Sequence, residues 1–167
     1  FNGTPIMSRT GHSYIKSKII ETNALLGGEM SGHIFFNDDW YGFDDAIYSA
    51  LRMIEILSKT KLTSHEVFNS YPKHFSTPEI NLKVPEEEKF KIIDELKTLI
   101  NSSGYVLIDI DGIRLENENS WGLIRASNTS PNLVLRFEGK TESDLLEIKN
   151  YFKELLSKIE IDLKLDF

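Results

Sequence analysis

The order of strand and helix signals in the second half of this 167-residue chain constrains its fold more than any other feature. Apolar and polar residues alternate at 80–84, which is the pattern of a half-buried strand. Pro85 and three glutamates then favour a helix start, because negative charge suits the first turn. Four more strand-like runs follow, at 105–108, 113–115, 121–126 and 133–137. Thr141 with Asp144 has the pattern of a capping box before a final helix.

This order predicts an α+β layer, in which an antiparallel sheet carries both helices on one face. Each predicted helix has apolar residues at helical spacing, which form the side that contacts the sheet. For the first helix the inward residues are expected to be Phe90, Ile93, Leu96 and Ile100. For the last helix they are expected to be Leu145, Ile148, Phe152, Leu155 and Ile159.

The first half of the chain has shorter signals. They predict a strand at 4–8, a helix from residue 11 or 12 to 22, and two short apolar runs at 24–30 and 33–36. Asp44 or Asp45 can cap another helix, with an apolar side of Ile47, Ala50, Leu51, Ile54 and Leu57. A polar stretch with one short helix around 66–71 follows, so we predict two domains, 1–72 and 73–167.

Composition excludes several classes of function. With 40% apolar and 27% charged residues, the chain is expected to be a folded soluble protein. Its net charge of −7 argues against nucleic-acid binding, and no apolar run is long enough for a membrane span. The lack of cysteine excludes disulfides, zinc–thiolate sites and a catalytic thiol, and fits a cytoplasmic protein. Because it starts at Phe1 and not at methionine, we expect the chain to be part of a longer protein.

Residues 125–131 have the chemistry of a phosphate-binding loop between two strands. Arg125 offers a planar fork of donors, and Ser127, Asn128 and Thr129 add hydroxyl and amide groups. No carboxylate occurs between residues 119 and 137, although the chain as a whole is acidic. A local excess of positive charge suits a small anion. The alternative is an ordinary turn, because Ser, Asn and Pro are common in turns.

A second group of polar residues lies in the glycine-rich segment 27–33. Glu29 and Ser31, two residues apart, can bind neighbouring hydroxyls of a sugar, one as acceptor and one as donor. His33 titrates near neutral pH and can transfer a proton, and His12 lies at a predicted junction into a helix. An ordinary glycine turn is again the alternative.

Asp109 and Asp111 resemble part of an acidic metal-binding loop, but a third carboxylate is missing. A turn that joins two strands is the better interpretation. We therefore predict no metal site in these residues.

Taken together, the motifs resemble the α-D-phosphohexomutase family, specifically the C-terminal part of its bacterial phosphomannomutase/phosphoglucomutase members. Several separate motifs in one order are more specific than any single one. They are Thr10-Gly11-His12, Gly28-Glu29-Met30-Ser31-Gly32-His33, Ser76-Thr77-Pro78-Glu79-Ile80-Asn81, Asp111-Gly112-Ile113-Arg114 and Arg125-Ala126-Ser127-Asn128-Thr129-Ser130-Pro131.

The resemblance implies a four-domain enzyme that interconverts hexose 1-phosphates and hexose 6-phosphates through a bisphosphorylated sugar. Residues 1–72 would be the C-terminal portion of a third, α/β domain with a sugar-specificity loop. Residues 73–167 would be the fourth domain, a TATA-binding-protein-like layer that binds phosphate. This fold name does not imply DNA binding.

The resemblance also implies roles for individual residues. Glu29 and Ser31 would contact sugar hydroxyls, and His33, with His12 nearby, would act as the proton shuttle. The phosphate that is not transferred would be bound by Arg125, Ser127, Asn128 and Thr129.

The chain lacks two parts of the family's machinery, namely the phosphoserine of the first domain and the magnesium loop of the second. We therefore expect it to be inactive alone, and to need Mg²⁺ and the missing N-terminal domains of the same protein. The expected ligand is mannose or glucose 1- or 6-phosphate. Two alternatives stay open: a portion of a phosphoglucosamine mutase, against which Met30 argues, and a standalone, non-catalytic phosphosugar-binding module.

Overall fold

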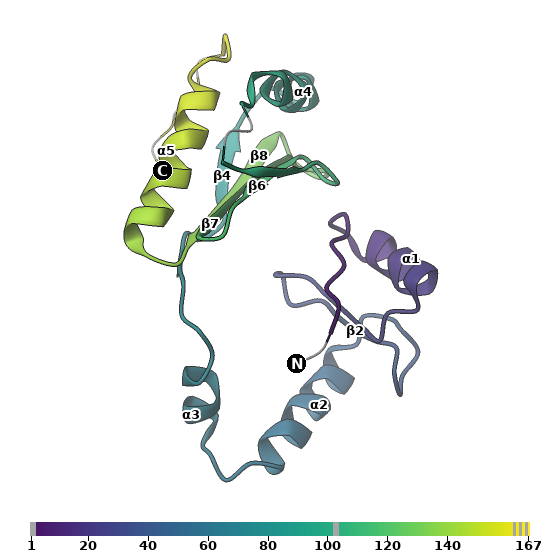
Figure 1. The fold of residues 1–167 in the computed structure, drawn as a ribbon. Helices are drawn as coiled ribbons and strands as arrows, with labels where there is room; N and C mark the ends of the chain where they lie inside the picture. Colours follow the sequence, from purple (N-terminus) through teal and green to yellow (C-terminus); the bar gives the residue numbers. More distant parts are fainter. Residues whose placement is uncertain (1–2, 102–103, 162, 164, 166) are drawn as a thin grey trace. The chain divides into compact units, whose positions relative to one another are not determined.

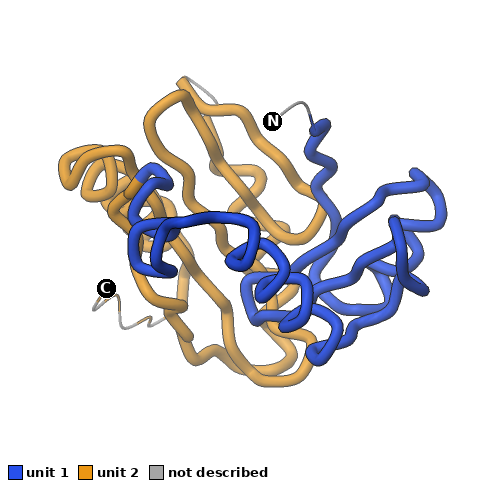
Figure 2. The backbone as a smooth tube through the Cα atoms, turned by 90° about the horizontal axis from the view of Figure 1, so that it is seen from below, with its two compact units in different colours: residues 1–72 blue, residues 73–167 orange. Residues whose placement is uncertain are grey.

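The chain divides into two compact units, residues 1–72 (unit 1) and 73–167 (unit 2), shown in blue and orange in Figure 2. The computed structural model describes residues 3–101, 104–161, 163, 165 and 167. Each unit has its own sheet and helices, and each is described by itself.

Unit 2 is built on one antiparallel sheet (Figure 1). The strand order is β3-β8-β7-β6-β5, and β4 pairs with β8 along the same edge as β3. The strands are β3 (Phe75–Ser76), β4 (Ile80–Lys83), β5 (Val106–Ile108), β6 (Ile113–Glu116), β7 (Ser120–Ala126) and β8 (Asn132–Gly139). Between β3 and β4, Thr77 continues the pairing, because its amide donates to the carbonyl of Phe137 at 3.0 Å.

Helices α4 (Lys89–Leu99) and α5 (Glu142–Leu156) pack against this sheet. Alternate residues of β7 are buried, which gives the sheet one apolar face and one partly exposed face. Gly122 on β7 allows a close approach, because a Cβ there would lie 2.6 Å from the Phe152 ring. Seventeen buried apolar residues from sheet and helices form one core, and the α+β prediction is confirmed.

The predicted strand ends hold to within two residues, and the capping box of Thr141 and Asp144 is present. The helix α5 ends at Leu156, so Ile159, which was expected on it, lies beyond its end, although it is still buried in the core. The prediction for α4 was wrong by one turn. Residues 86–88 form a turn, so the three glutamates precede the helix. The buried side therefore starts at Lys89 and includes Ile92, whereas Phe90 is 57% exposed.

The described residues of unit 1 form three helices and a two-stranded antiparallel sheet. Its elements are α1 (His12–Thr22), β1 (Leu26–Gly28), β2 (Ile34–Phe36), α2 (Ala46–Ser58) and α3 (Ser64–Asn69). Its buried core consists of Ile15 and Ile19 from α1 and Phe35 from β2. This core is small because a sheet of two three-residue strands offers little apolar surface.

One expectation for unit 1 was wrong, and one confirmed helix is more exposed than its apolar side suggests. Residues 4–8 form no strand, because a strand needs a hydrogen-bonded neighbour and β1 pairs only with β2 in the described chain. The helix α2 forms and Asp45 caps it, but none of its residues is buried. Ile47, Leu51 and Ile54 are 58–78% exposed, since the small sheet does not cover that face.

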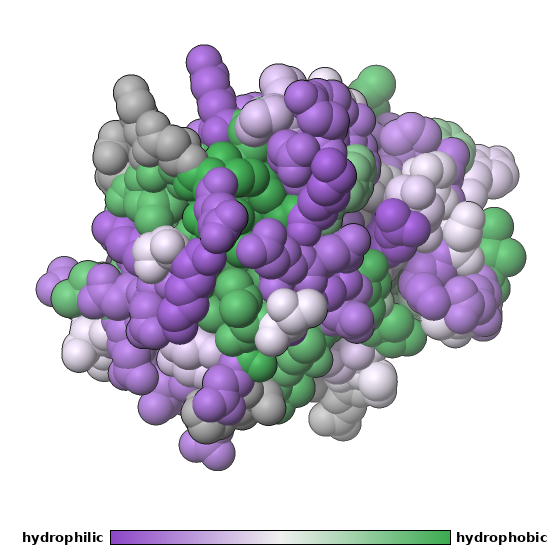
Figure 3. All heavy atoms as spheres, turned by 90° about the horizontal axis from the view of Figure 1, so that it is seen from above, coloured by the Kyte–Doolittle hydropathy of each residue, from purple (hydrophilic) through white to green (hydrophobic). Residues whose placement is uncertain are grey.

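Apolar side chains also reach the surface elsewhere, as the green patches among purple residues in Figure 3 show. In unit 2 they include Phe90, Val106 and Leu146. Among the described residues no helix is both long and apolar enough to cross a membrane.

Candidate functional site

The segment 127–131 connects the two central strands β7 and β8. The amide of Ser127 donates to the carbonyl of Asn132 at 2.9 Å, which closes the loop at its base. The loop is therefore an extension of the longest strand pair in the sheet, which runs from Ser120 opposite Gly139 to Ala126 opposite Leu133. A seven-pair ladder fixes where the loop begins and ends.

The Ser127 hydroxyl organises the loop from within. Its oxygen accepts hydrogen bonds from the amides of Thr129 and Ser130, at 3.3 and 3.2 Å, and from the Ser130 hydroxyl at 2.9 Å. Ser127 is 6% exposed, whereas Asn128 and Thr129 are exposed. Of the predicted phosphate ligands, Asn128 and Thr129 thus face solvent, and Ser127 shapes the backbone that carries them.

Arg125 lies on β7 at the mouth of this loop, on the sheet face away from the buried core. It is partly exposed, and in the described part of the chain its guanidinium forms no hydrogen bond or ion pair. Arg114 on the neighbouring strand differs, because it bonds Glu116 at 2.8 Å and stacks 4.1 Å from the Trp121 ring centre. Arg125 is therefore the arginine whose donors are available to an anion at the loop.

The glycine-rich segment is the turn between β1 and β2. The amide of Glu29 donates to the carbonyl of His33 at 2.9 Å, and that of Gly32 to the carbonyl of Glu29 at 3.0 Å. Gly32 has a φ of 92°, which a side chain would strain. Ser31 is exposed at the tip of this turn.

Glu29 links this turn to the start of α1. One of its carboxylate oxygens accepts a hydrogen bond from the Gly11 amide at 2.7 Å. Gly11 precedes His12, the first residue of α1. The structure therefore brings the segments of Glu29 and His12 together, although they lie 17 positions apart in the sequence.

His33 has a partner that the sequence analysis missed. Its Nδ1 lies 2.5 Å from Oδ2 of Asp44, whose other oxygen accepts from the Ile34 amide at 3.2 Å. The hydrogen bond with His33 is the main reason why the pKa of Asp44 is lowered, and the charge of His12 adds to this effect. With Nδ1 engaged, Nε2 is the ring nitrogen left for a substrate.

The position of Asp44 beside Asp45 was a signal in the sequence that Asp44 has a role other than capping α2. Only one of two neighbouring carboxylates can cap the helix, and Asp45 does so by accepting from the Tyr48 amide at 2.9 Å. Asp44 was interpreted as an alternative cap, whereas it pairs with β2 through a bridge to Phe35.

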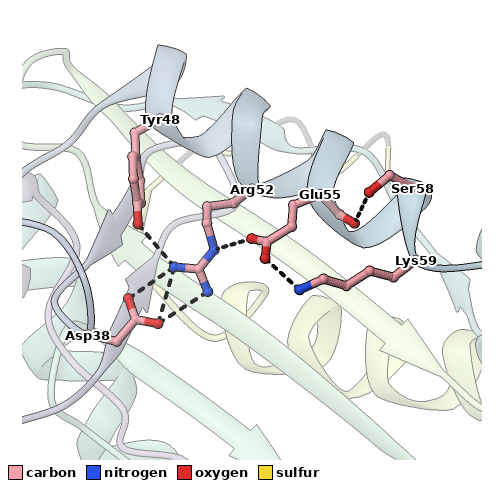
Figure 4. A network of polar contacts seen from close by, with 6 residues as sticks. All are labelled: Asp38, Tyr48, Arg52, Glu55, Ser58 and Lys59. Atoms are coloured by element: carbon pink, nitrogen blue, oxygen red, sulfur yellow. Dashed lines mark hydrogen bonds and ion pairs between the residues drawn. The ribbon is translucent and has the colours of Figure 1, made fainter.

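A network around Arg52 holds the segment 37–45 that carries Asp44 (Figure 4). Arg52 on α2 donates to both oxygens of Asp38 and to the Tyr48 hydroxyl, at 3.1–3.2 Å. This arginine lowers the pKa of Asp38, and its own pKa is raised. Trp40 adds to the attachment, because its ring stacks on Tyr48 with centres 4.3 Å apart.

The acidic pair Asp109 and Asp111 lies in the turn between β5 and β6, as predicted. Asp109 has Lys97 at 4.0 Å. Within the described residues no three histidine or acidic side chains gather closely enough to hold a metal ion. These residues thus do not fit the magnesium loop of the family.

Comparisons with known proteins agree with the resemblance. Residues 1–75 match the family model for phosphoglucomutase/phosphomannomutase, alpha/beta/alpha domain III. Residues 79–155 match the model for the C-terminal domain of the same family.

Curated relatives and a solved structure are similar over nearly the whole chain. A phosphomannomutase/phosphoglucomutase of Pseudomonas putida is 50% identical over 165 residues, which make up 99% of this chain and 36% of that protein. A phosphoglucomutase of Neisseria meningitidis serogroup A is 48% identical over 156 residues, which make up 92% of this chain and 34% of that protein. A phosphoglucomutase/phosphomannomutase family protein from Burkholderia thailandensis superposes with a TM-score of 0.86 and 42% identity, over 95% of this chain and 34% of that one.

This chain thus spans about a third of the length of these relatives. It matches two consecutive domains of one family, in their order, at high identity. The chain belongs to the phosphoglucomutase/phosphomannomutase family.

Proposed function

We propose that this chain is the substrate-binding portion of a phosphomannomutase/phosphoglucomutase that interconverts hexose 1-phosphate and hexose 6-phosphate. Unit 1 would bind sugar hydroxyls and move a proton, and unit 2 would bind the phosphate that is not being transferred. The names and identities of the relatives support the reaction class.

The observation that carries the proposal is the position of Arg125 beside the loop 127–131. Its partly exposed guanidinium has no hydrogen bond or ion pair in the described residues, and the exposed Asn128 and Thr129 follow three and four residues later in the chain. A phosphate offers oxygens to all three, and charge-assisted bonds from arginine are the strongest of them. Ser127 then acts mainly through the backbone, since its hydroxyl already serves the loop.

The turn of unit 1 offers complementary chemistry for the sugar. Glu29 has one carboxylate oxygen bonded to Gly11, and Ser31 is exposed two residues later. His33 would accept or return the proton of the reacting hydroxyl through Nε2, while Asp44 holds its ring through Nδ1. His12 would contribute from the adjoining start of α1.

The proposed reaction also sets a requirement for the phosphate loop. A bisphosphorylated intermediate must present each end in turn, so the phosphate loop must accept either phosphate. Magnesium and the phosphoserine would belong to other domains of the whole protein, and Mg²⁺ would neutralise the phosphoryl group there. We place this activity in the cytoplasm, in line with the cysteine-free composition.

The test is an interconversion assay on the whole protein and on this chain alone, with mannose, glucose and glucosamine 1-phosphates in parallel. We expect turnover of the mannose and glucose substrates by the whole protein with Mg²⁺, and none by the chain of 167 residues. Preference for glucosamine 1-phosphate would favour a phosphoglucosamine mutase. Absence of turnover with all three, together with saturable phosphosugar binding, would favour a binding module.

A further inference from the structure

Lys89 is a buried cation that the proposed chemistry does not use. It is the first residue of α4, and 2% of its side chain is exposed. Its ammonium bonds Glu86 at 2.6 Å and donates to the main-chain carbonyl of Ser130 at 3.3 Å. Ser130 belongs to the loop 127–131, which lies 41 residues further along the chain.

The local setting of Lys89 is unfavourable in two ways. A positive charge at the first residue of a helix opposes the helix dipole. A buried ammonium also loses hydration, which a single partner rarely repays. The sequence could meet the packing requirement with an apolar residue, as Ile92 and Leu96 do on the same side of α4. A residue that breaks local rules is expected where it serves a site.

This contact is one of two that hold the C-terminal end of the loop by its main-chain carbonyls. The carbonyl of Ser130 accepts from Lys89, and that of Pro131 accepts from the Val84 amide at 3.1 Å. A hollow lined by Val84, Pro131 and their neighbours borders this end of the loop. The amide and the hydroxyl of Ser130 both donate to the Ser127 hydroxyl, so Ser130 connects Lys89 to the residue that organises the loop.

We propose that Lys89 is the positioning residue of the phosphate loop: its buried ammonium fixes the Ser130 carbonyl and adds positive charge behind the anion. This inference rests on the proposed function, because it takes the loop to bind phosphate. Lys89 does not touch the substrate, and it acts through the backbone of Ser130.

The test uses Lys89→Met in the chain of 167 residues, with glucose 6-phosphate and inorganic phosphate as probes. Amide resonances of residues 125–130 report binding and loop structure. We expect the variant to bind both probes about tenfold more weakly, as for a lost hydrogen bond to a charged group. We also expect the amides of 128–130 to shift without ligand. In the whole protein KM should rise while kcat is largely kept.

Lys91→Met is the matched control. Lys91 lies in the same turn of α4 and pairs with Glu88 at 3.0 Å, again three residues earlier, but it is 70% exposed. This variant loses the same charge without losing a loop contact, so it should bind like the parent. Equal affinity of Lys89→Met and the parent would overturn the role of Lys89 and leave the proposed function standing. If the parent itself shows no change at 125–130 with either probe, the proposed function and this inference fail together.

Lys89→Met is expected to fold, because a buried ion pair can often be replaced by an apolar residue of similar size and Glu86 stays solvated. If it does not fold, the ammonium resonance of Lys89 in the parent decides. Its shift should follow the loop amides during the phosphate titration. An ammonium resonance that does not move while the amides do would overturn the proposal.

Discussion

The two candidate binding loops are built in opposite ways. The loop 127–131 joins the two central strands of the unit 2 sheet. One face of this sheet contributes to a core of 17 buried apolar residues. The turn 29–33 joins two three-residue strands, and its contacts with Gly11 and Asp44 come from partly or fully exposed side chains. The core beneath it has three buried residues.

This difference fits what the two loops would bind. A phosphate is recognised by donors in fixed positions, which a core-backed strand pair supplies. A sugar that must be accepted in two orientations needs contacts that can be rearranged, and exposed side-chain hydrogen bonds allow this. Unit 2 is therefore expected to be the more stable part of the chain.

The largest effect should follow a cavity in the core of unit 2. Phe152→Ala removes a ring that is 1% exposed and packs 5.3 Å from the Phe137 ring, so unit 2 should lose about 3–5 kcal/mol of unfolding free energy. Phe35→Ala in unit 1 should cost less, because only Ile15 and Ile19 share this buried core with it and they can collapse around the gap. Each unit has one tryptophan, Trp121 and Trp40, so urea denaturation of single-tryptophan variants reports each unit separately. Equal losses in both units would contradict the contrast.

The next largest effect concerns phosphate binding. Arg125→Ala should weaken transition-state and substrate binding by the whole protein by about 2–4 kcal/mol, because a charge-assisted contact is lost. Arg114→Ala is the control, since this arginine shares the sheet face but is paired with Glu116. Steady-state kinetics with glucose 1-phosphate measure both variants. An unchanged KM in Arg125→Ala would contradict the proposal that the loop binds phosphate.

His33→Gln should lower kcat of the whole protein about a hundredfold, with little change in KM, because a proton shuttle acts mainly in the chemical step. Asp44→Asn should lower kcat less, since it removes the partner that orients the ring. Asp45→Asn is the control, because this neighbour caps α2 and does not touch His33. A loss confined to KM in His33→Gln would argue for sugar binding and against proton transfer.

The smallest effect is a pH dependence in unit 1. Arg52 lowers the pKa of Asp38 in the folded chain, so the unfolded state binds more protons as the pH falls below about 4. The contribution of this pair to stability is therefore present above that pH and is lost as the pH falls through the folded pKa. Asp38→Asn should flatten the decline of unit 1 stability as the pH falls below about 4. Urea denaturation with the Trp40 signal measures it, and an unchanged slope would show that the pair contributes nothing.

Features that a short segment encodes could be predicted from the sequence. The capping box of Thr141 and Asp144 and the turn at 109–112 needed only local chemistry. The order of elements in unit 2 was sufficient for an α+β layer, because consecutive strands pair readily as neighbours.

Features that depend on segments meeting in space were missed. Asp44 reaches His33 only because the chain returns to β2 after the loop 37–43, and nothing local separates it from Asp45 as a cap. Lys89 was not singled out from the sequence, because the helix was expected to start at the three glutamates, whereas it starts one turn later and Lys89 is buried. The exposure of the apolar side of α2 could not be predicted from its periodicity, since apolar residues at helical spacing do not reveal whether another element covers them.

The most direct test of the central claim is a crystal structure of this chain with glucose 1-phosphate bound. The account predicts the phosphate at the loop 127–131, within hydrogen-bond distance of the Arg125 guanidinium and of Asn128 or Thr129. A phosphate bound at the turn 29–33 instead, with the loop 127–131 empty, would contradict it.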